Sequence, residues 1–520
     1  MKPTLALSLV LLAGGCSVGP SYTAPQPTAP TAWNAIESGA VATGVPSQPQ
    51  PTSPDLASWW KVFADPTLDS LVERALRANP SLREAAARVR EARALRGISD
   101  SKAYPTLDAR AAAARSRGSE NINGGSFNDH DTSLYSVGLD ASWEIDVFGG
   151  VRREIEAADA DLASATEASR DVMISLLAEV ARNYSEARGF QRRIDVTRSS
   201  IKVQEDTVQV AQARLNAGIA SELDLTQARA LLETRRAALP ILLTGLQQSL
   251  HRLGVLIGEG PGALTHELGD PGPIPPVPAA VPVGLPSDLL RRRPDIRRAE
   301  RDLASATARI GVAQADLYPR FSLTGSFGFL SNKPASLLDL DSRAWSVGPS
   351  VRWNVFDMRR TRFQIEAAGE REKQALARYD ATVLSAFEEV ENRLVAFTQE
   401  QSRRASLAQA VLANQRAVQL SDDLYKAGVR DFLNVLDSQR ALFDSTDALV
   451  QSDIAVTTNL IALYKALGGG WDAGSDAPSD APPSAPGQPP PAHAAQAPAT
   501  PPRAEPLKLE SSSQSAPPTR

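Results

Sequence analysis

Residues 136–147 read SVGLDASWEIDV, and their side chains alternate between apolar and polar along the chain. The apolar positions are Val137, Leu139, Ala141, Trp143, Ile145 and Val147. Asp140, Glu144 and Asp146 lie between them. Because successive side chains of a β-strand point to opposite faces, this pattern predicts a strand with one apolar and one acidic face. The apolar face covers either a protein core or lipid, and the rest of the sequence has to distinguish the two.

Three further stretches alternate in the same way. The four predicted strands span residues 104–115, 134–148, 318–330 and 345–356. Aromatic residues concentrate on the apolar face and near the strand ends, as in the interfacial girdles of membrane strands. A half-buried antiparallel sheet packed on helices has the same period. Lipid is favoured because each strand is long enough to cross a bilayer when tilted, and no later stretch is apolar and long enough for a membrane helix.

The body of the chain is a duplicated unit. NPSLREA at Asn79 recurs as RPDIRRA at Arg293, and AYPTLDA at Ala103 recurs as LYPRFSL at Leu317. Each copy has two short helices, two strands and then two long helices, with copies roughly 210 residues apart. The expected divisions are 1–15 signal peptide, 16–54 lipidated N-terminus and extended linker, 55–257 first repeat, 258–286 Pro/Gly-rich connector, 287–471 second repeat and 472–520 disordered Pro/Ala-rich tail.

Four strands cannot close a barrel in lipid, since about eight are needed. An open sheet edge in a bilayer leaves backbone groups unpaired at a cost of several kcal/mol each. Three copies give about twelve strands, an even number within the known range. The fold class predicted is therefore an α+β membrane protein that forms a trimeric 12-stranded β-barrel continued by helices. The residues expected to face its lumen are Asp108, Arg110, Asp140, Glu144, Asp146 and Arg352.

The first sixteen residues, MKPTLALSLVLLAGGC, predict an export signal. Lys2 supplies positive charge, an apolar run follows, and Gly14 and Gly15 precede a cleavage point. The position of Cys16 resembles the lipobox of bacterial lipoproteins, which implies cleavage before Cys16 and acylation of that residue. Ser17, rather than Asp, follows it, and this favours sorting to the outer membrane by the same analogy. A plain secreted protein with an unmodified cysteine is the alternative.

Composition excludes several functional classes. The 520 residues carry a formal net charge of −5, which suggests no nucleic-acid partner. The four histidines, His130, His251, His266 and His493, lack metal-ligand spacing or a nucleophile partner. We therefore expect no enzyme activity, no cofactor and no metal.

Two pairs of long helices complete the plan. Residues 151–217 contain no proline and repeat apolar side chains near every 3.5 positions, which predicts a coiled-coil helix on the order of 100 Å long. The return helix, about 221–253, carries Pro240, which should kink or divide it. Residues 358–427 and 431–467 repeat the hairpin. Gly218 and Gly428 lie where each chain reversal must occur.

These features together resemble the outer membrane factor family of TolC and OprM type. The residues that carry the resemblance are CSVGPSY after the signal, the duplicated strand–helix plan, the paired hairpin tips and the terminal LYKALGGGW. The resemblance implies a homotrimer in outer-membrane lipid with a long α-helical barrel in the periplasm. It also implies a periplasmic adaptor and an inner-membrane resistance-nodulation-division pump as partners. The function implied is passive export of drugs or other small toxic compounds through a closable periplasmic aperture.

In this family, acidic rings and Tyr and Arg links between the coiled coils close the aperture. The resemblance assigns this role to Asp224, Tyr425, Arg430 and Asp437, and Asn434 stands where the family has another aspartate. The acidic lumen suggests a mild preference for cations.

Residues at the hairpin tips are candidates for docking of the adaptor. They are Arg214, Leu215, Gly218 and Gly428. Two alternatives remain open from the sequence. One is an exit duct for type I protein secretion, and the other is a periplasmic coiled-coil scaffold or adaptor.

Overall fold

A computed structural model describes residues 17–50, 52, 56–117 and 131–472. The predicted signal peptide, Cys16 and the predicted tail beyond residue 472 lie outside the described residues. The chain divides into two units, Met1–Ala473 and Gly474–Arg520, and all described residues belong to the first.

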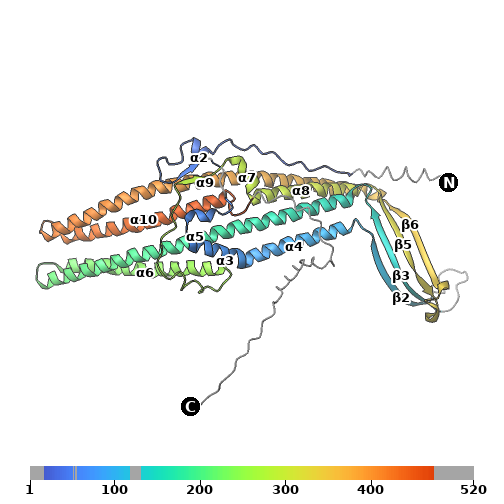
Figure 1. Cartoon of the computed structure of the whole chain (residues 1–520), viewed down its shortest axis with the longest axis horizontal. Coiled ribbons are helices and arrows are strands. Elements are labelled where there is room, and N and C mark those ends of the chain that lie inside the picture. Colours follow the sequence, from blue (N-terminus) through green and yellow to red (C-terminus); the bar gives the residue numbers. More distant parts are fainter. Residues whose placement is uncertain (1–16, 51, 53–55, 118–130, 473–520) are drawn as a thin grey trace, which may run out of the picture. The chain divides into compact units, whose positions relative to one another are not determined.

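The two repeats have the same order of elements (Figure 1). The first contains α3 (Pro66–Ala78), α4 (Pro80–Ser101), β2 (Thr106–Ser116), β3 (Thr132–Ile145), α5 (Gly150–Asn216) and α6 (Glu222–Leu256). The second contains α7 (Pro286–Arg292), α8 (Pro294–Ala315), β5 (Arg320–Ser331), β6 (Arg343–Arg352), α9 (Met358–Lys426) and α10 (Phe432–Ala466). Outside them lie α2 (Asn34–Glu37), β1 (Gln48–Gln50) and β4 (Ala280–Pro282), and β1 pairs with β4 in parallel.

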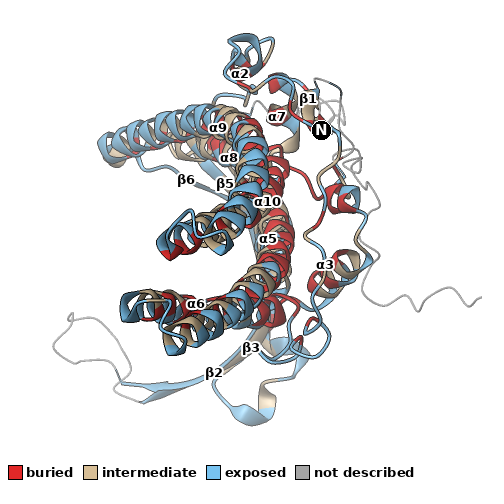
Figure 2. Cartoon of the chain, turned by 90° about the vertical axis from the view of Figure 1, so that its left-hand side faces the viewer, coloured by how far each residue is buried: buried red, intermediate tan, exposed pale blue. Residues whose placement is uncertain are grey.

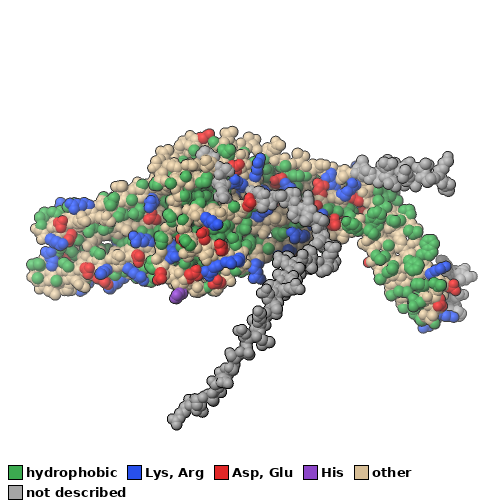
Figure 3. Space-filling view, in the orientation of Figure 1, with side chains coloured by type: hydrophobic (Ala, Val, Ile, Leu, Met, Phe, Trp, Pro, Cys, Tyr) green, Lys and Arg blue, Asp and Glu red, His purple; other side chains and the backbone are tan. Residues whose placement is uncertain are grey.

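The long strands form one antiparallel sheet in the order β2-β3-β5-β6. Ala109 is opposite Leu139, Leu139 is opposite Phe327, and Phe327 is opposite Trp345, so one apolar row crosses all four strands. Directly opposite residues share a face. The predicted alternation therefore gives the sheet one continuous apolar face, and hydrophobic side chains gather over the strands in Figure 3. Two strands end earlier than the alternation predicts. The last residue of β3 with a ladder partner is Ile145, and that of β6 is Arg352, although the alternating pattern continues beyond both.

The long helices form two hairpins, α5/α6 and α9/α10, that extend to the end of the molecule away from the sheet (Figure 1). α6 continues through Pro240 without a break, so of the two predicted effects of this proline, a kink or a division, the division is wrong. Proline removes one backbone hydrogen bond within the helix, and α6 packs along α5. Among the described residues, no helix is both long enough and apolar enough to cross a membrane.

The helices next to the sheet lie side by side in the order α4-α5-α8-α9. They form a curved layer, and the buried residues of α5 and α10 lie toward the side on which α3 lies (Figure 2). The main core fills this side and includes Trp59, Leu177 and Tyr464, with the Trp59 ring stacked 5.4 Å from that of Tyr464. Burial of such large side chains is the main source of stability for the layer.

The N-terminal segment adds to this core. Trp33 is buried in it and donates from Nε1 to the Gly284 carbonyl at 3.0 Å. The carboxylate of Glu391 on α9 accepts from the N–H groups of Asn34 and Ala35, at 2.7 and 2.8 Å. The predicted linker is therefore extended in part but bound along α9.

Candidate functional site

The two hairpin tips are built alike. After α5, the Gly218 N–H donates to Leu215 and the Ile219 N–H to Arg214. Gly428 makes the corresponding contacts after α9, and the φ angles of the two glycines are 73° and 71°. A left-handed glycine that closes such paired bonds ends a helix and reverses the chain. The turn chemistry predicted from the sequence is present at both tips.

Side chains from both hairpins meet just above these turns. Ala228 and Leu225 of α6 pack in one buried cluster with Phe432 and Leu436 of α10. Burial of this cluster favours contact between the two hairpins, since apolar area leaves water.

A cation–π contact lies beside the apolar cluster. The Arg214 guanidinium lies 4.4 Å from the centre of the Tyr425 ring, which is 5.2 Å from that of Phe432. Burial raises the pKa of the Tyr425 hydroxyl, Arg214 opposes this rise, and Asp224 adds to it. Three of the predicted residues, Arg214, Asp224 and Tyr425, are therefore brought together. Leu215 packs against the same cluster, so Arg214 and Leu215 face the other hairpin.

Asp224 also has a local task. Its Oδ2 accepts from the Ser221 N–H at 3.1 Å, and the Ser221 Oγ accepts from the Asp224 N–H at 3.2 Å. This capping box starts α6 and satisfies two of its free N–H groups. Substitutions at Asp224 would disturb the hairpin turn as well as any aperture.

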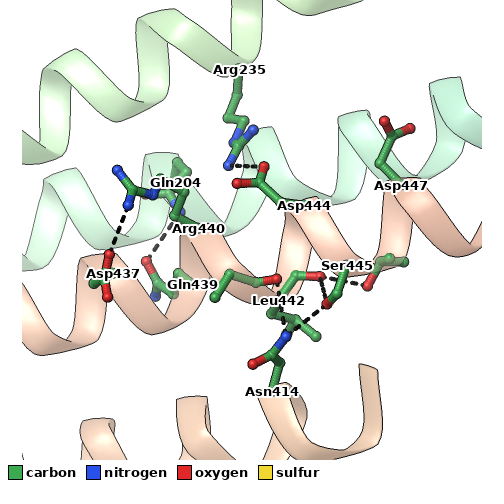
Figure 4. Close-up of polar contacts among 12 residues, drawn as sticks. Gln204, Arg235, Asn414, Asp437, Gln439, Arg440, Leu442, Asp444, Ser445 and Asp447 are labelled. Carbon is green, nitrogen blue, oxygen red and sulfur yellow. Dashed lines mark hydrogen bonds and ion pairs between the residues drawn. The ribbon is translucent and has the colours of Figure 1, made fainter. Parts of the chain in front are cut away.

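The remaining predicted aperture residues do not meet within one chain. Arg430 and Asn434 are exposed, and the Asn434 side chain donates to the Asp431 carbonyl at 3.3 Å. Asp437 pairs with Arg440 one turn along α10 at 3.1 Å, with 67% of its side chain exposed (Figure 4). Exposed links of this kind contribute about 0.2–1 kcal/mol.

A stronger set of contacts joins the hairpins farther from the tips, and we call it the hairpin ladder. It consists of Gln204–Gln439, Arg235–Asp444 and Arg193–Asp447. Gln204 donates to Gln439 at 3.0 Å, and Arg235 Nη2 lies 3.2 Å from Asp444 (Figure 4). Arg193 binds Asp447 with two nitrogens at 2.7 and 3.0 Å. All three pairs connect α10 with α5 or α6.

The hairpin ladder has no sequence signal of its own. Its charged members, such as Arg193 and Asp447, are separated by more than two hundred residues and resemble ordinary solvated helix charges. Only the packing of α10 against α5 and α6 brings them together. Arg235 illustrates this, because the residue is only 8% exposed and its guanidinium lies 3.8 Å from the centre of the Phe443 ring.

The polar face of the sheet collects five of the six residues predicted to face a lumen. Asp108 is directly opposite Asp140, and Arg110 lies 3.4 Å from Asp140. Glu144 lies 3.6 Å from Arg320, which is opposite Arg352. The polar face of the strands therefore carries as many carboxylates as guanidinium groups, three of each: Asp108, Asp140 and Glu144, and Arg110, Arg320 and Arg352. This balance does not support the predicted preference for cations.

Asp146 is the sixth predicted residue and lies beyond the end of β3. Its Oδ2 accepts from the Arg152 N–H at 2.9 Å, so it caps the beginning of α5. Next to it a pocket of about 380 Å³ opens where the polar face meets the helices. Its lining includes Thr106, Glu144 and the ion pair Lys102–Glu154. The charged face of the sheet thus continues onto α4 and α5.

Comparisons with known proteins agree on one family. The family model for outer membrane efflux proteins matches residues 71–259 and 285–469. The chain is 35% identical over 479 residues to outer membrane protein OprJ of Pseudomonas aeruginosa, covering 91% of this chain and 97% of OprJ. It is 32% identical over 480 residues to the pyoverdine export outer membrane protein OpmQ of the same organism, covering 91% and 98%. The solved structure of the outer-membrane channel OprN matches with a TM-score of 0.81 and 37% identity, covering 88% of this chain and all of that one.

Proposed function

Because the chain belongs to the outer membrane efflux protein family, we propose that three copies of it form a closed 12-stranded barrel in the outer membrane, continued by a helical barrel in the periplasm. The chain is an outer-membrane channel subunit of a tripartite efflux system. It conducts small toxic compounds passively, without catalysis, from an inner-membrane pump of the resistance-nodulation-division class to the exterior.

The observation that carries the proposal is the single apolar face of the four-stranded sheet. An apolar row such as Ala109, Leu139, Phe327 and Trp345 suits lipid on the outside of a barrel. The opposite face, with its balanced charges, suits a water-filled lumen. The strands β2 and β6 each have one open edge, and pairing of these edges between copies satisfies their backbone groups.

The hairpin tips form the closable aperture in this proposal. The cluster of Leu225 and Ala228 with Phe432 and Leu436 holds the two hairpins of one subunit together. Arg430, Asn434 and Asp437 are exposed for contacts with neighbouring copies. A periplasmic adaptor docks at the tips around Gly218 and Gly428. The exposed side chains of Ile219 and Val429 add an apolar surface there. Acylation of Cys16 anchors the N-terminus to the membrane.

Deletion of the gene should sensitise the host to toxic compounds. A channel for small compounds predicts a marked fall in the inhibitory concentration of several drugs or solvents, because the pump loses its exit to the exterior. The measurement is growth inhibition across a panel of compounds, with the intact gene restored as a control. Unchanged sensitivity together with loss of one secreted protein would instead indicate a protein-secretion duct.

Replacing Arg430 or Asp437 by alanine should raise single-channel conductance of the reconstituted protein. Each exposed link contributes about 0.2–1 kcal/mol, so removal of three symmetric copies shifts the closed aperture toward the open state by a modest factor. Asp422→Ala is the matched control. Asp422 pairs with Lys426 on α9 near the same tip, and neither residue belongs to the predicted aperture. If both test variants conduct like the control, Arg430 and Asp437 do not belong to the aperture.

A further inference from the structure

The pocket of about 380 Å³ where the polar face of the sheet meets the helices is here called the junction pocket. Its lining comes from the end of α4, from β2, β3 and β5 where they approach the helices, from the start of α5 and from the end of α8. Pockets for small organic molecules have volumes from about 300 Å³ upward. The junction pocket is therefore large enough for a compound of the kind that the proposed channel conducts.

Part of the junction pocket is apolar. Its apolar lining includes Phe148, Val151, Val312 and Ala315. The Phe148 ring is stacked on the ring of Tyr318, with their centres 4.5 Å apart, so a neighbouring side chain supports this wall. An apolar wall of this kind shields the hydrocarbon part of a ligand from water, and a few polar groups then fix its orientation.

The rest of the lining is polar and carries both signs of charge. Its charged residues are Lys102, Glu144, Asp146, Glu154 and Arg320. Three of these five are acidic and two are basic. The junction pocket thus has an excess of carboxylates, although the polar face of the strands is balanced as a whole.

Most of these charges are already bound to another side chain or to the backbone. The Lys102 ammonium lies 2.5 Å from the Glu154 carboxylate. Asp146 accepts from the Arg152 N–H at 2.9 Å and lies 3.3 Å from the guanidinium of the same residue. These contacts fix the carboxylates of Glu154 and Asp146 at the start of α5.

Glu144 is the exception. The Arg320 guanidinium lies 3.6 Å from its carboxylate, which is beyond hydrogen-bond distance, and donates instead to Asp316 at 2.5 Å. No residue in the part of the chain that the structure describes donates a hydrogen bond to the Glu144 side chain. An ionised carboxylate is an acceptor only, and its strongest hydrogen bonds come from cationic donors. Glu144 is therefore available to a cationic N–H group that enters the junction pocket.

We propose that the junction pocket binds amphipathic organic cations, with a protonated amine donating to Glu144 and the hydrocarbon part lying against Phe148 and Val312. This deepens the proposed function, on which it rests, by naming a class of compound and a binding site for it. Glu144 belongs to the polar face that lines the lumen in that proposal, so compounds in transit reach the pocket from the lumen. Organic anions are disfavoured, because they meet an excess of carboxylates.

Binding of three matched probes to the purified full-length protein in detergent tests this site. The probes are 2-phenylethylammonium, 2-phenylethanol and 3-phenylpropionate, which share a ring and a short arm but differ in charge. We expect the ammonium to bind about tenfold more tightly than the other two, because hydrogen bonds between charged groups are the stronger kind. Ligand-observed NMR titration measures all three affinities, and empty micelles give the background.

Two variants separate the effect of charge from that of shape. Glu144→Gln retains the shape of the side chain and should reduce binding of the ammonium to the level of 2-phenylethanol. Ser142→Phe places a ring in the lining of the junction pocket and should weaken binding of all three probes. Asp108→Asn is the matched control, since it removes a carboxylate from the same face of the sheet outside this lining, and it should leave all three affinities unchanged.

The outcomes distinguish this site from the proposed function. Equal affinity for the three probes, tighter binding of 3-phenylpropionate, or an equal loss in Asp108→Asn and Glu144→Gln would overturn the cation site. Deletion of the gene tests the channel separately, so these results would leave the channel intact. A deletion that does not sensitise the host would refute the export function even where the purified protein binds the ammonium.

Discussion

Replacing Asp447 by asparagine should raise the single-channel conductance of the reconstituted protein several-fold. Asp447 is the only carboxylate bound to Arg193 among the contacts described here, and it holds α10 against α5 in the hairpin ladder. The two side chains are only 22% and 16% exposed, so the substitution leaves a mostly buried guanidinium without its counter-charge. Breaking a buried pair in this way costs about 3–5 kcal/mol. In the proposed channel this arrangement of the hairpins is the closed one, and it loses that free energy in every subunit.

Asp437→Asn is the matched control for this experiment. It removes the same charge from the same helix two to three turns nearer the tip, where the carboxylate is largely exposed. We expect a much smaller rise in conductance from it. The exchanged variant with Arg193→Asp and Asp447→Arg should return conductance toward the starting value. Equal conductance for Asp447→Asn and Asp437→Asn would remove the hairpin ladder from control of the aperture.

Among the substitutions proposed in this protein, Glu167→Gln should lower the free energy of unfolding most. The Glu167 carboxylate on α5 binds Arg170 at 2.7 Å and Arg297 of α8 at 2.9 Å, and it is 6% exposed. Both guanidinium groups also lie over the ring of Trp471, at 4.3 and 5.1 Å from its centre. Without the carboxylate, two like charges remain together in a largely buried place. The expected loss in the free energy of unfolding is about 3–5 kcal/mol per subunit.

The measurement is the thermal unfolding midpoint of the detergent-solubilised protein. Glu370→Gln on α9 is the control, because Glu370 pairs with Lys373 on an exposed helix surface where water screens the pair. Replacing Trp471 by leucine should lower the midpoint less than Glu167→Gln, since it removes the ring and keeps the charges paired. A midpoint unchanged by Glu167→Gln would contradict the role given to this cluster.

Periodic features were the ones that sequence reasoning could predict. The alternation around Trp143 and Trp353 gave the strands and their shared apolar face, and Gly218 and Gly428 marked the two hairpin turns. These signals are local, because strand faces and helix ends depend on side chains a few residues apart. The family model, which matches both repeats, confirmed the recognition of the family.

Contacts between distant segments were not predictable. Arg214, a predicted docking residue, lies over the ring of Tyr425 in the opposite hairpin. Asp146, a predicted lumen residue, caps α5. Both outcomes depend on how elements pack, and a single sequence carries no record of the partner. The same reason hid the hairpin ladder.

The binding of the N-terminal segment along α9 fixes an order of events during synthesis. Trp33 and the backbone of Asn34 and Ala35 have partners at Gly284 and Glu391, and Ser47 exchanges hydrogen bonds with Gln401. Those partners are translated roughly 240 to 360 residues later. The N-terminal segment therefore cannot make these contacts until most of the polypeptide has been translated. Its docking along α9 is a late step in folding, and Trp33 lacks its Gly284 partner until then.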